Sequence, residues 1–239
     1  VFNADVAEAE LTMADASVKV TNDIDKAKLD TLRANTTGDI TLTSLTEDKG
    51  DLATIAGFSD VILSTANITV TDNVDKSEAD TIDAYSNTSG TVTLTSITDT
   101  VANVTAVENN ANISLDTSTI TVTDAATLAN ANAINNFTTA QVTLQKVEDT
   151  VSNITSIDAI DSNEVSMGAA AITVTNTASL SDATTLNGFT TGKVTLSSVQ
   201  DTFSNILSID SIDSNDVSMG AAAITVTDAV SFFEATGIN

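Results

Sequence analysis

Several residue types on which protein chemistry commonly depends are missing from this chain. Its 239 residues include no histidine, cysteine, proline or tryptophan, and aromatic residues make up only 3%. Without histidine and cysteine, a chain has no Ser-His-Asp triad, cysteine nucleophile or disulfide framework, and almost no means of building a zinc site. The sequence therefore predicts a protein that is not an enzyme.

Basic residues are also scarce. Eight Lys and Arg stand against 33 Asp and Glu, which gives a formal net charge of −25, and five of the eight bases precede residue 50. Such a surface repels nucleic acid and anionic membranes. No apolar run approaches the length of a transmembrane helix. We therefore expect neither a nucleic-acid partner nor insertion into a membrane.

What the chain does contain is an internal repeat. Ile-Thr-Val-Thr begins at Ile68, Ile120, Ile172 and Ile224, at intervals of 52 residues, and a degenerate copy begins at Val18. Repetition along a whole chain is typical of solenoids, in which each repeat contacts its neighbours. We expect one elongated body over 1–239, with repeat units at approximately 18–67, 68–119, 120–171 and 172–223 and partial repeats at 1–17 and 224–239.

Three strand-like segments recur, each alternating apolar and small polar residues as a half-buried strand does. They are the Ile-Thr-Val-Thr segments, the Val-Thr-Leu segments at 40–42, 92–94, 142–144 and 194–196, and shorter segments at 11–13, 61–63, 113–115, 165–167 and 217–219. The first two kinds predict alternating strands of one parallel sheet, with Ile, Val and Leu inward and Thr outward. The shorter segments are expected to form a second sheet or a hairpin edge.

The segments between the strands carry apolar residues at a spacing of three, as in Leu128, Ala131 and Ile134. This spacing favours short helical returns, although it also fits a 3₁₀ turn or an extended solenoid edge. Polar residues that directly follow the Ile-Thr-Val-Thr segments are expected to cap the N-termini of these helices. They are Asn22, Asp72, Asp124, Asn176 and Asp228.

A strand, a return and a second parallel strand make a right-handed crossover. The chain is therefore predicted to be a right-handed parallel β-solenoid with short helical returns and about nine coils, two coils to each 52-residue repeat. At roughly 4.8 Å per strand, its sheet would be on the order of 40 Å long. No capping sequence is evident, so we expect either that the parent chain continues on both sides with more of the same repeats or that copies stack head to tail, which exposed strand edges would favour.

One acidic cluster occurs twice in the same repeat position. Hard oxygen ligands close together in sequence suit Ca²⁺, although the spacing is not that of an EF-hand. The alternative is an ordinary polar turn that leads into the short strand. No other cofactor is expected. The candidate calcium ligands are Asp158, Asp161, Asn163 and Glu164 in one copy and Asp210, Asp213, Asn215 and Asp216 in the other.

Three segments resemble repeats in very large surface and secreted proteins of marine cyanobacteria and other aquatic bacteria. They are 67–72 (Asn-Ile-Thr-Val-Thr-Asp), 36–41 (Thr-Thr-Gly-Asp-Ile-Thr) and 51–58 (Asp-Leu-Ala-Thr-Ile-Ala-Gly-Phe). That group includes adhesins, haemolysin-like proteins and cell-surface swimming proteins. The resemblance implies an extracellular or cell-surface location and a structural or adhesive role. This chain departs from the group in lacking a calcium-binding nonapeptide array.

Together these observations predict an extracellular structural repeat protein that associates with itself in a filament, a surface layer or an adhesin stalk. A glycan- or surface-binding adhesin module is the alternative, because Thr and Asn recur along the strands. A polysaccharide-degrading enzyme is the weaker alternative. Such enzymes need aromatic or basic residues in a substrate groove, and here the aromatic residues are only Tyr85 and seven Phe.

Overall fold

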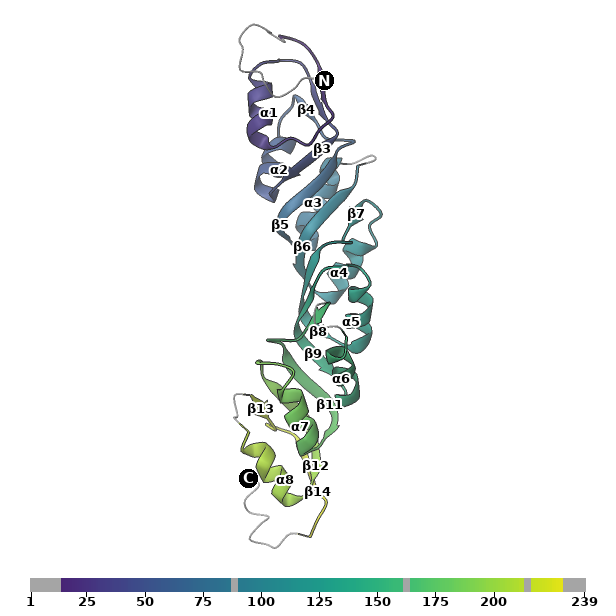
Figure 1. The fold of residues 1–239 in the computed structure, drawn as a ribbon, viewed down its shortest axis with the longest axis vertical. Helices are drawn as coiled ribbons and strands as arrows, with labels where there is room; N and C mark the ends of the chain where they lie inside the picture. The colour runs from purple at the N-terminus through teal and green to yellow at the C-terminus, as the bar shows by residue number, and fades with distance from the viewer. Residues whose placement is uncertain (1–13, 87–89, 161–163, 213–215, 230–239) are drawn as a thin grey trace. The chain divides into compact units, whose positions relative to one another are not determined.

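The computed structural model describes residues 14–86, 90–160, 164–212 and 216–229. Over these residues the chain has a repeat-like parallel β/α fold, in which strands alternate with short helices (Figure 1). It divides into two compact units, Val1–Thr95 with Asn110–Ser114 and Ser96–Asn109 with Leu115–Asn239. The single elongated body expected from the sequence stays a prediction.

In the first compact unit the strands form parallel pairs. Strand β2 lies between β1 and β4, β3 pairs with β5, and the first residues of β6 pair with β7. Its elements are β1 (Val18–Val20), α1 (Lys26–Arg33), β2 (Ile40–Leu42), β3 (Ser44–Glu47), α2 (Lys49–Ala56), β4 (Val61–Ile62), β5 (Asn67–Val74), α3 (Lys76–Ser86), the start of β6 (Val92–Asp99) and β7 (Ile113–Ser114).

In the second compact unit the parallel order is the end of β6, then β8, β9, β11 and β12, with β14 beside β12. Helices α4 to α8 each pack against the next (Figure 1). Helices α5 to α8 also contact the strands on either side of them in sequence, and α4 contacts β8. The elements are α4 (Val101–Glu108), β8 (Thr119–Ala126), α5 (Leu128–Asn135), β9 (Val142–Asp149), α6 (Val151–Asp158), β10 (Val165–Ser166), β11 (Ala171–Ala178), α7 (Leu180–Asn187), β12 (Val194–Asp201), α8 (Phe203–Asp210), β13 (Val217–Ser218) and β14 (Ala223–Val226).

The strand register confirms the alternation read from the sequence. Ile120 of β8 lies opposite Val142 of β9, and Thr121 lies opposite Thr143. Both apolar residues are fully buried, whereas the two threonines are only half-buried. Because successive side chains point to opposite faces of a sheet, the Ile and Val positions form the core and the Thr positions form an outward row.

The described short strands differ from expectation, because each pairs in parallel with a Val-Thr-Leu strand and none forms a hairpin edge; β4 lies with β1 and β2 in a separate three-stranded sheet, whereas β7, β10 and β13 pair with the long strands β6, β9 and β12. Strand β10 pairs in parallel with the first residues of β9, and β11 pairs with its last four residues. Each Val-Thr-Leu strand is therefore shared along its length by a short strand and the long strand that follows it. Strands β7 and β13 occupy the same place on β6 and β12. Segment 11–13 lies outside the described residues.

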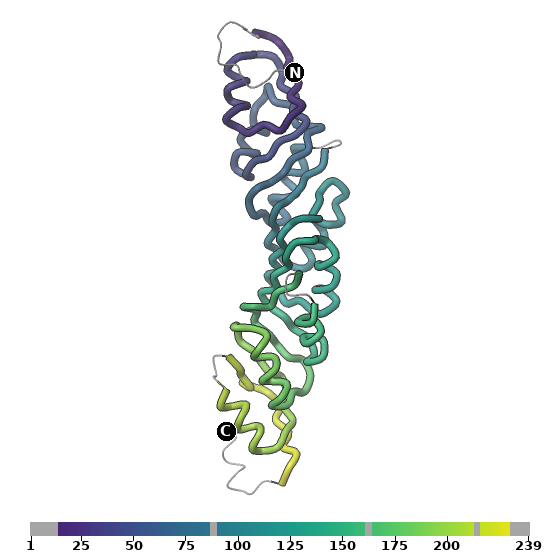
Figure 2. The backbone as a smooth tube through the Cα atoms, viewed as in Figure 1, coloured from purple at the N-terminus to yellow at the C-terminus, as the bar shows by residue number. Residues whose placement is uncertain are grey.

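The returns between strands are α-helices, which settles the alternatives that the spacing left open. In α5 the buried residues are Ala131 and Ile134, and in α6 they are Ile154 and Ile157. We call each long strand, together with the helix that follows it, a strand–helix module. Figure 2 follows the backbone from strand to helix and back in each module. The longest helix, α3, has 11 residues. None of the helices within the described part of the chain is long and apolar enough to cross a membrane.

The predicted helix caps were wrong. Helix α5 is capped by Thr127 and not by Asp124, and α7 is capped by Ser179 and not by Asn176. The reason is that β8 and β11 continue for several residues beyond Ile-Thr-Val-Thr, past a bulge in their pairing, before the helix begins. The other candidates behave alike within the described residues, since Asp25 caps α1 in place of Asn22 and Asp75 accepts from the Glu78 N–H in place of Asp72. No described helix follows Asp228.

Candidate functional site

A polar residue near the C-terminal end of a strand bonds to the module before it, and in β3, β9 and β12 it is the last residue of the strand. In seven modules the backbone N–H of the first helical residue donates to a side-chain oxygen of the following module. Examples are Val101 N to Asp124 Oδ1 at 2.8 Å and Leu180 N to Asp201 Oδ2 at 3.0 Å. We call the acceptors joint residues; they are Glu47, Asp72, Asp124, Asp149, Asn176, Asp201 and Asp228, and they serve α1, α2 and α4 to α8.

A joint carboxylate accepts a hydrogen bond from a helix N–H group that has no acceptor within its own helix. The first N–H groups of an α-helix have no acceptor within the helix, and this end carries partial positive charge. In α8 the N-cap hydroxyl of Thr202 accepts from Asn205 N, while Asp228 of the following strand accepts from Phe203 N. Two donors at one helix end are thus satisfied, one from within the module and one from its neighbour.

Two joint carboxylates also organise the module to which they belong. Asp201 Oδ1 accepts from the backbone N–H of Thr202 and from the Asn205 side chain, both at 2.8 Å. Its bonds from Leu180, Asn205 and Thr202 lower the pKa of Asp201. Burial alone would raise the pKa of Asp149, but the corresponding bonds from Leu128, Asn153 and Thr150 outweigh it and lower that pKa. These carboxylates therefore link two consecutive helices.

Buried hydroxyls form a second link between modules. Thr138 Oγ1 donates to Ser118 O and Thr190 Oγ1 donates to Ala170 O, each at 2.7 Å and across 20 residues of sequence. Thr36 and Ser86 make the same bond to Ala16 and Ala66. Because a buried hydroxyl without a partner is costly, these recurring Thr and Ser residues serve the packing of neighbouring modules.

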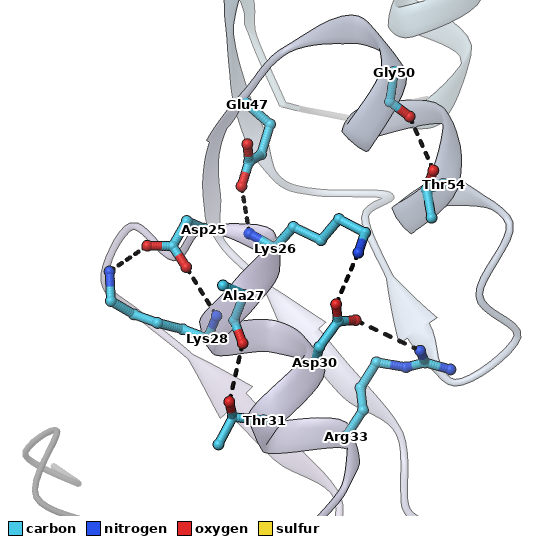
Figure 3. Close-up of polar contacts among 10 residues, drawn as sticks. All are labelled: Asp25, Lys26, Ala27, Lys28, Asp30, Thr31, Arg33, Glu47, Gly50 and Thr54. Carbon is cyan, nitrogen blue, oxygen red and sulfur yellow. Dashed lines mark hydrogen bonds and ion pairs between the residues drawn. The ribbon is translucent and has the colours of Figure 1, made fainter.

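In the first compact unit, Lys26, Lys28, Arg33, Lys49 and Lys76 are each paired with an acid, and Figure 3 shows the first three of them. Lys26 Nζ lies 2.8 Å from Asp30, and the Lys26 N–H donates to the joint residue Glu47. Arg33 forms a bidentate pair with Asp60, with both contacts at 2.8 Å, and its guanidinium stacks on Phe58. The Arg33 guanidinium lowers the pKa of Asp60. The cations thus bind neighbouring acids of the same chain.

The candidate calcium residues are only partly described. Asp161, Asn163, Asp213 and Asn215 lie outside the described residues. Asp158 and Asp210 end α6 and α8, Glu164 accepts from the Asn135 amide at 3.2 Å, and the backbone oxygen of Asp216 accepts from Val194 N at 2.6 Å. Across 14–86, 90–160, 164–212 and 216–229, no three acidic side chains gather closely enough to hold a metal ion. The calcium site stays a hypothesis.

Two acidic residues lie at the C-terminal ends of helices. The sequence did not single out Glu108, and it pointed to Asp158 only as a candidate calcium ligand. Burial, together with the charge of Asp116, raises the pKa of Glu108 in α4. Partial desolvation raises the pKa of Asp158, which ends α6. The negative end of the helix dipole adds to this cost. Such a shift by itself marks an unfavourable carboxylate and does not assign a reaction.

Two shallow depressions flank the single tyrosine, Tyr85, in the first compact unit. One, of about 210 Å³, includes Lys49, Glu78 and Thr81 in its lining, and Lys49 Nζ is paired with Glu78 at 2.8 Å. The other, of about 350 Å³, is mostly apolar. Neither has the enclosed form with converging polar groups that is typical of a small-molecule site.

Comparisons of this chain with protein-family models, with curated proteins and with solved structures find no match. The site is therefore interpreted from its own chemistry. Within the described residues, the joint residues and the buried hydroxyls of the turns bond to neighbouring modules. The joint residues are accordingly the candidate functional element.

Proposed function

We propose that this chain is an extracellular structural repeat protein, forming part of a filament, a surface layer or an adhesin stalk. The observation that carries the proposal is the row of joint residues. Seven helix N-termini are each completed by the next module, as Val151 N is by Asn176 and Phe203 N by Asp228. A chain whose recurring polar groups tie neighbour to neighbour is suited to transmitting load along a stack.

In this proposal the modules wind as coils of a right-handed parallel β-solenoid, about nine in all. Parallel pairing of consecutive long strands and packing of consecutive helices support it. The right-handed sense follows from the general preference of strand–helix–strand connections. The acidic surface, at a net charge of −25, keeps such a rod soluble by self-repulsion.

The extracellular location and the self-association are part of the same proposal. They rest on the resemblance of segments such as 67–72 to bacterial surface proteins and on the exposed strand edges of a stack. No catalytic role is assigned, because histidine and cysteine are absent from the chain. Ca²⁺ stays a hypothesis for the two acidic clusters at 158–164 and 210–216.

Electron microscopy of the protein, combined with a glycan-binding array, tests this function. Rods or filaments that bind no glycan are the expected result. Saturable binding to a defined glycan would instead establish the adhesin module, with the half-exposed Thr rows of the strands as its first candidate surface. Compact particles without an elongated form would contradict both the solenoid and the structural role.

A further inference from the structure

The two bases of the second compact unit lie opposite the same residue of its sheet. Residues 96–229 contain 15 acids but only two bases, Lys146 and Lys193. Lys146 of β9 lies opposite Ala171 of β11. On the other side of β11, Val194 lies opposite Ile172, and the Ile172 N–H donates to Lys193 O at 2.8 Å. Lys193 therefore also lies opposite Ala171. We call Lys146, Ala171 and Lys193 the lysine rung.

The lysine rung lies on the outward face of the sheet. The residues that follow its members in sequence, Val147, Ile172 and Val194, point into the core and are 0–1% exposed. Because successive side chains of a strand alternate between the two faces, the rung points away from the core, and all three of its residues are exposed. Among the described residues neither of its lysines is paired with an acid, in contrast to the five paired bases of the first compact unit.

The rung departs from the repeat at both lysines. In the preceding repeat the corresponding positions are Ser96 of β6 and Gln141, on either side of Thr119. In the following repeat Ser198 of β12 lies opposite Ala223. The pairing of the strands and the packing of the core therefore do not require a cation at either position. Two unpaired cations side by side on one face instead favour an anion as their partner.

The spacing of the rung fits a small anion. At roughly 4.8 Å per strand, the Cα atoms of Lys146 and Lys193 are about 10 Å apart. The side chain of Ala171 between them is a single methyl group, and the long lysine stems are flexible enough to bring both ammonium groups to one ligand. Thr173 is the next outward residue of β11, and Thr195 lies opposite it. Their hydroxyls are further donors beside the same space.

We propose that Lys146 and Lys193 bind a tetrahedral oxyanion, inorganic phosphate or sulfate, above Ala171. Such an ion offers each ammonium group an oxygen of its own, and lysine binds phosphate as a point charge. The bound ion ties β9 to β12 across β11 and stabilises the folded second unit by mass action. This site goes beyond the structural role proposed above and does not depend on it.

Charge favours a free ion over an anionic polymer at this site. The many acids of the chain repel a polyanion along its length, whereas for a small ion their effect is screened beyond about 8–10 Å at physiological ionic strength. Glu148 lies opposite Thr173 on the same outward face and is exposed. Its carboxylate offsets part of the charge of the two lysines, so we expect weak binding that weakens further as chloride is added.

Nuclear magnetic resonance titration with inorganic sulfate, exchanged for chloride at constant ionic strength, tests the site. The backbone amides of the lysine rung are expected to shift and to saturate, and phosphate should act in the same way. Lys146→Gln and Lys193→Gln should each weaken binding roughly two- to fivefold, the range for an exposed ion pair, and together abolish saturation. Glu148→Gln should strengthen binding. Glutamine is a mild replacement, because Gln141 already holds the position that corresponds to Lys193.

Lys76→Gln is the matched control, because Lys76 belongs to the first compact unit and is paired with Asp80. It should leave the titration unchanged, and circular dichroism confirms that each variant folds. Sulfate raises the melting temperature of most proteins because it is excluded from their surface, so only a rise that the double lysine variant lacks supports the site.

Three results would overturn the proposal. The first is a set of wild-type shifts that grow linearly with sulfate and never saturate. The second is saturation that the double lysine variant retains. The third is binding of dextran sulfate, per sulfate group, that is tighter than binding of the free ion, which would replace the small ion by a polyanion as the ligand.

Discussion

At the scale of single residues, the turn that follows the helix after each Ile-Thr-Val-Thr strand comes close to the backbone of the preceding turn. This close approach limits the size of the side chain that the turn can hold. A Cβ placed on Gly192 would lie 2.3 Å from Ala170 O and 2.7 Å from Ala169 O. Thr190, two residues earlier, bonds to the same Ala170 oxygen. The glycine thus lets the hydroxyl and the turn contact one strand end together.

We predict that Gly192→Ala destabilises the protein by about 1–3 kcal/mol, the usual cost of overpacking a tight site. Ala140 holds the same repeat position, so a shift of the backbone can admit a methyl group there and complete unfolding is not expected. Chemical denaturation measures the change. Gly168→Ala is the control, because its Cβ would lie 3.5 Å from the nearest atom outside its immediate chain neighbours. Equal losses in the two variants would contradict the steric explanation.

The joint carboxylates predict how stability depends on pH. The pKa of Asp201 is lowered in the folded state, so its contribution is fully present above the unfolded pKa and is lost as pH falls through the folded one. Asp201→Asn should therefore lower stability at neutral pH and flatten the acid limb of a plot of unfolding free energy against pH. Glu148→Gln, at an exposed position outside the joints, is the control. An acid limb with unchanged slope in Asp201→Asn would count against the joint.

At the scale of the secondary-structure element, strands were easier to predict than helix ends. The alternation in Ile-Thr-Val-Thr is local, and a strand with one buried face requires it. The short strands were misplaced because their partner, the start of a Val-Thr-Leu strand, is more than 20 residues away in sequence. Asp124 was assigned to the wrong helix because β8 continues past Ile-Thr-Val-Thr to Ala126, and the capping signal that starts at Thr127 was not recognised.

A local signal for the correct caps was present. Thr127 and Asn130 form a reciprocal capping box, as do Ser179 and Asp182. This spacing of three is the known signature of a helix start. The joint bonds themselves had no such signal, since their partners lie 21 to 25 residues apart, as in Val101 with Asp124 and Val151 with Asn176. Only the spacing of whole modules brings these groups together.

The joints give a graded prediction for α4. Asp124→Ala removes both the acceptor and the charge at Val101 N, and should cost about 0.5–2 kcal/mol, as loss of a helix cap does. Asp124→Asn keeps an acceptor and should cost less, because Asn176 serves α6 in that way. Thermal melting orders the variants, and hydrogen exchange at the Val101 amide should rise in Asp124→Ala. Similar losses in both variants would show that the charge, and not the bond, matters.

A calcium titration can distinguish whether the acidic clusters form a metal site or an ordinary polar turn. Because Glu164 already bonds to Asn135 and the Asp216 carbonyl is taken up by strand pairing, we expect the polar turn. A calorimetric titration with Ca²⁺ should then show no binding heat, and melting should be the same with a chelator. Heat that Glu164→Gln and Asp216→Asn together abolish would establish the calcium site instead.

At the scale of the whole molecule, stability should be local and additive. Each module contacts mainly its neighbours, so damage to one module does not directly remove the contacts of distant ones. The division into two compact units supports the expectation that damage stays local, because most contacts of a residue are made within its own unit. A chain of this kind differs from a single-core globule, in which one buried charge unfolds the whole.

Ile172→Asp tests this expectation in the second compact unit. Ile172 is 1% exposed, and a carboxylate there would lack a partner in the apolar core of β11. An unpaired buried charge is among the most destabilising of substitutions. Limited proteolysis followed by mass spectrometry should find new cleavage around 165–201, with residues 14–95 still protected. Thr175→Asp, at an exposed position of the same strand, should leave the pattern unchanged. Cleavage that spreads equally through both units would mean that the chain unfolds as one cooperative body, and the additive description would then be wrong.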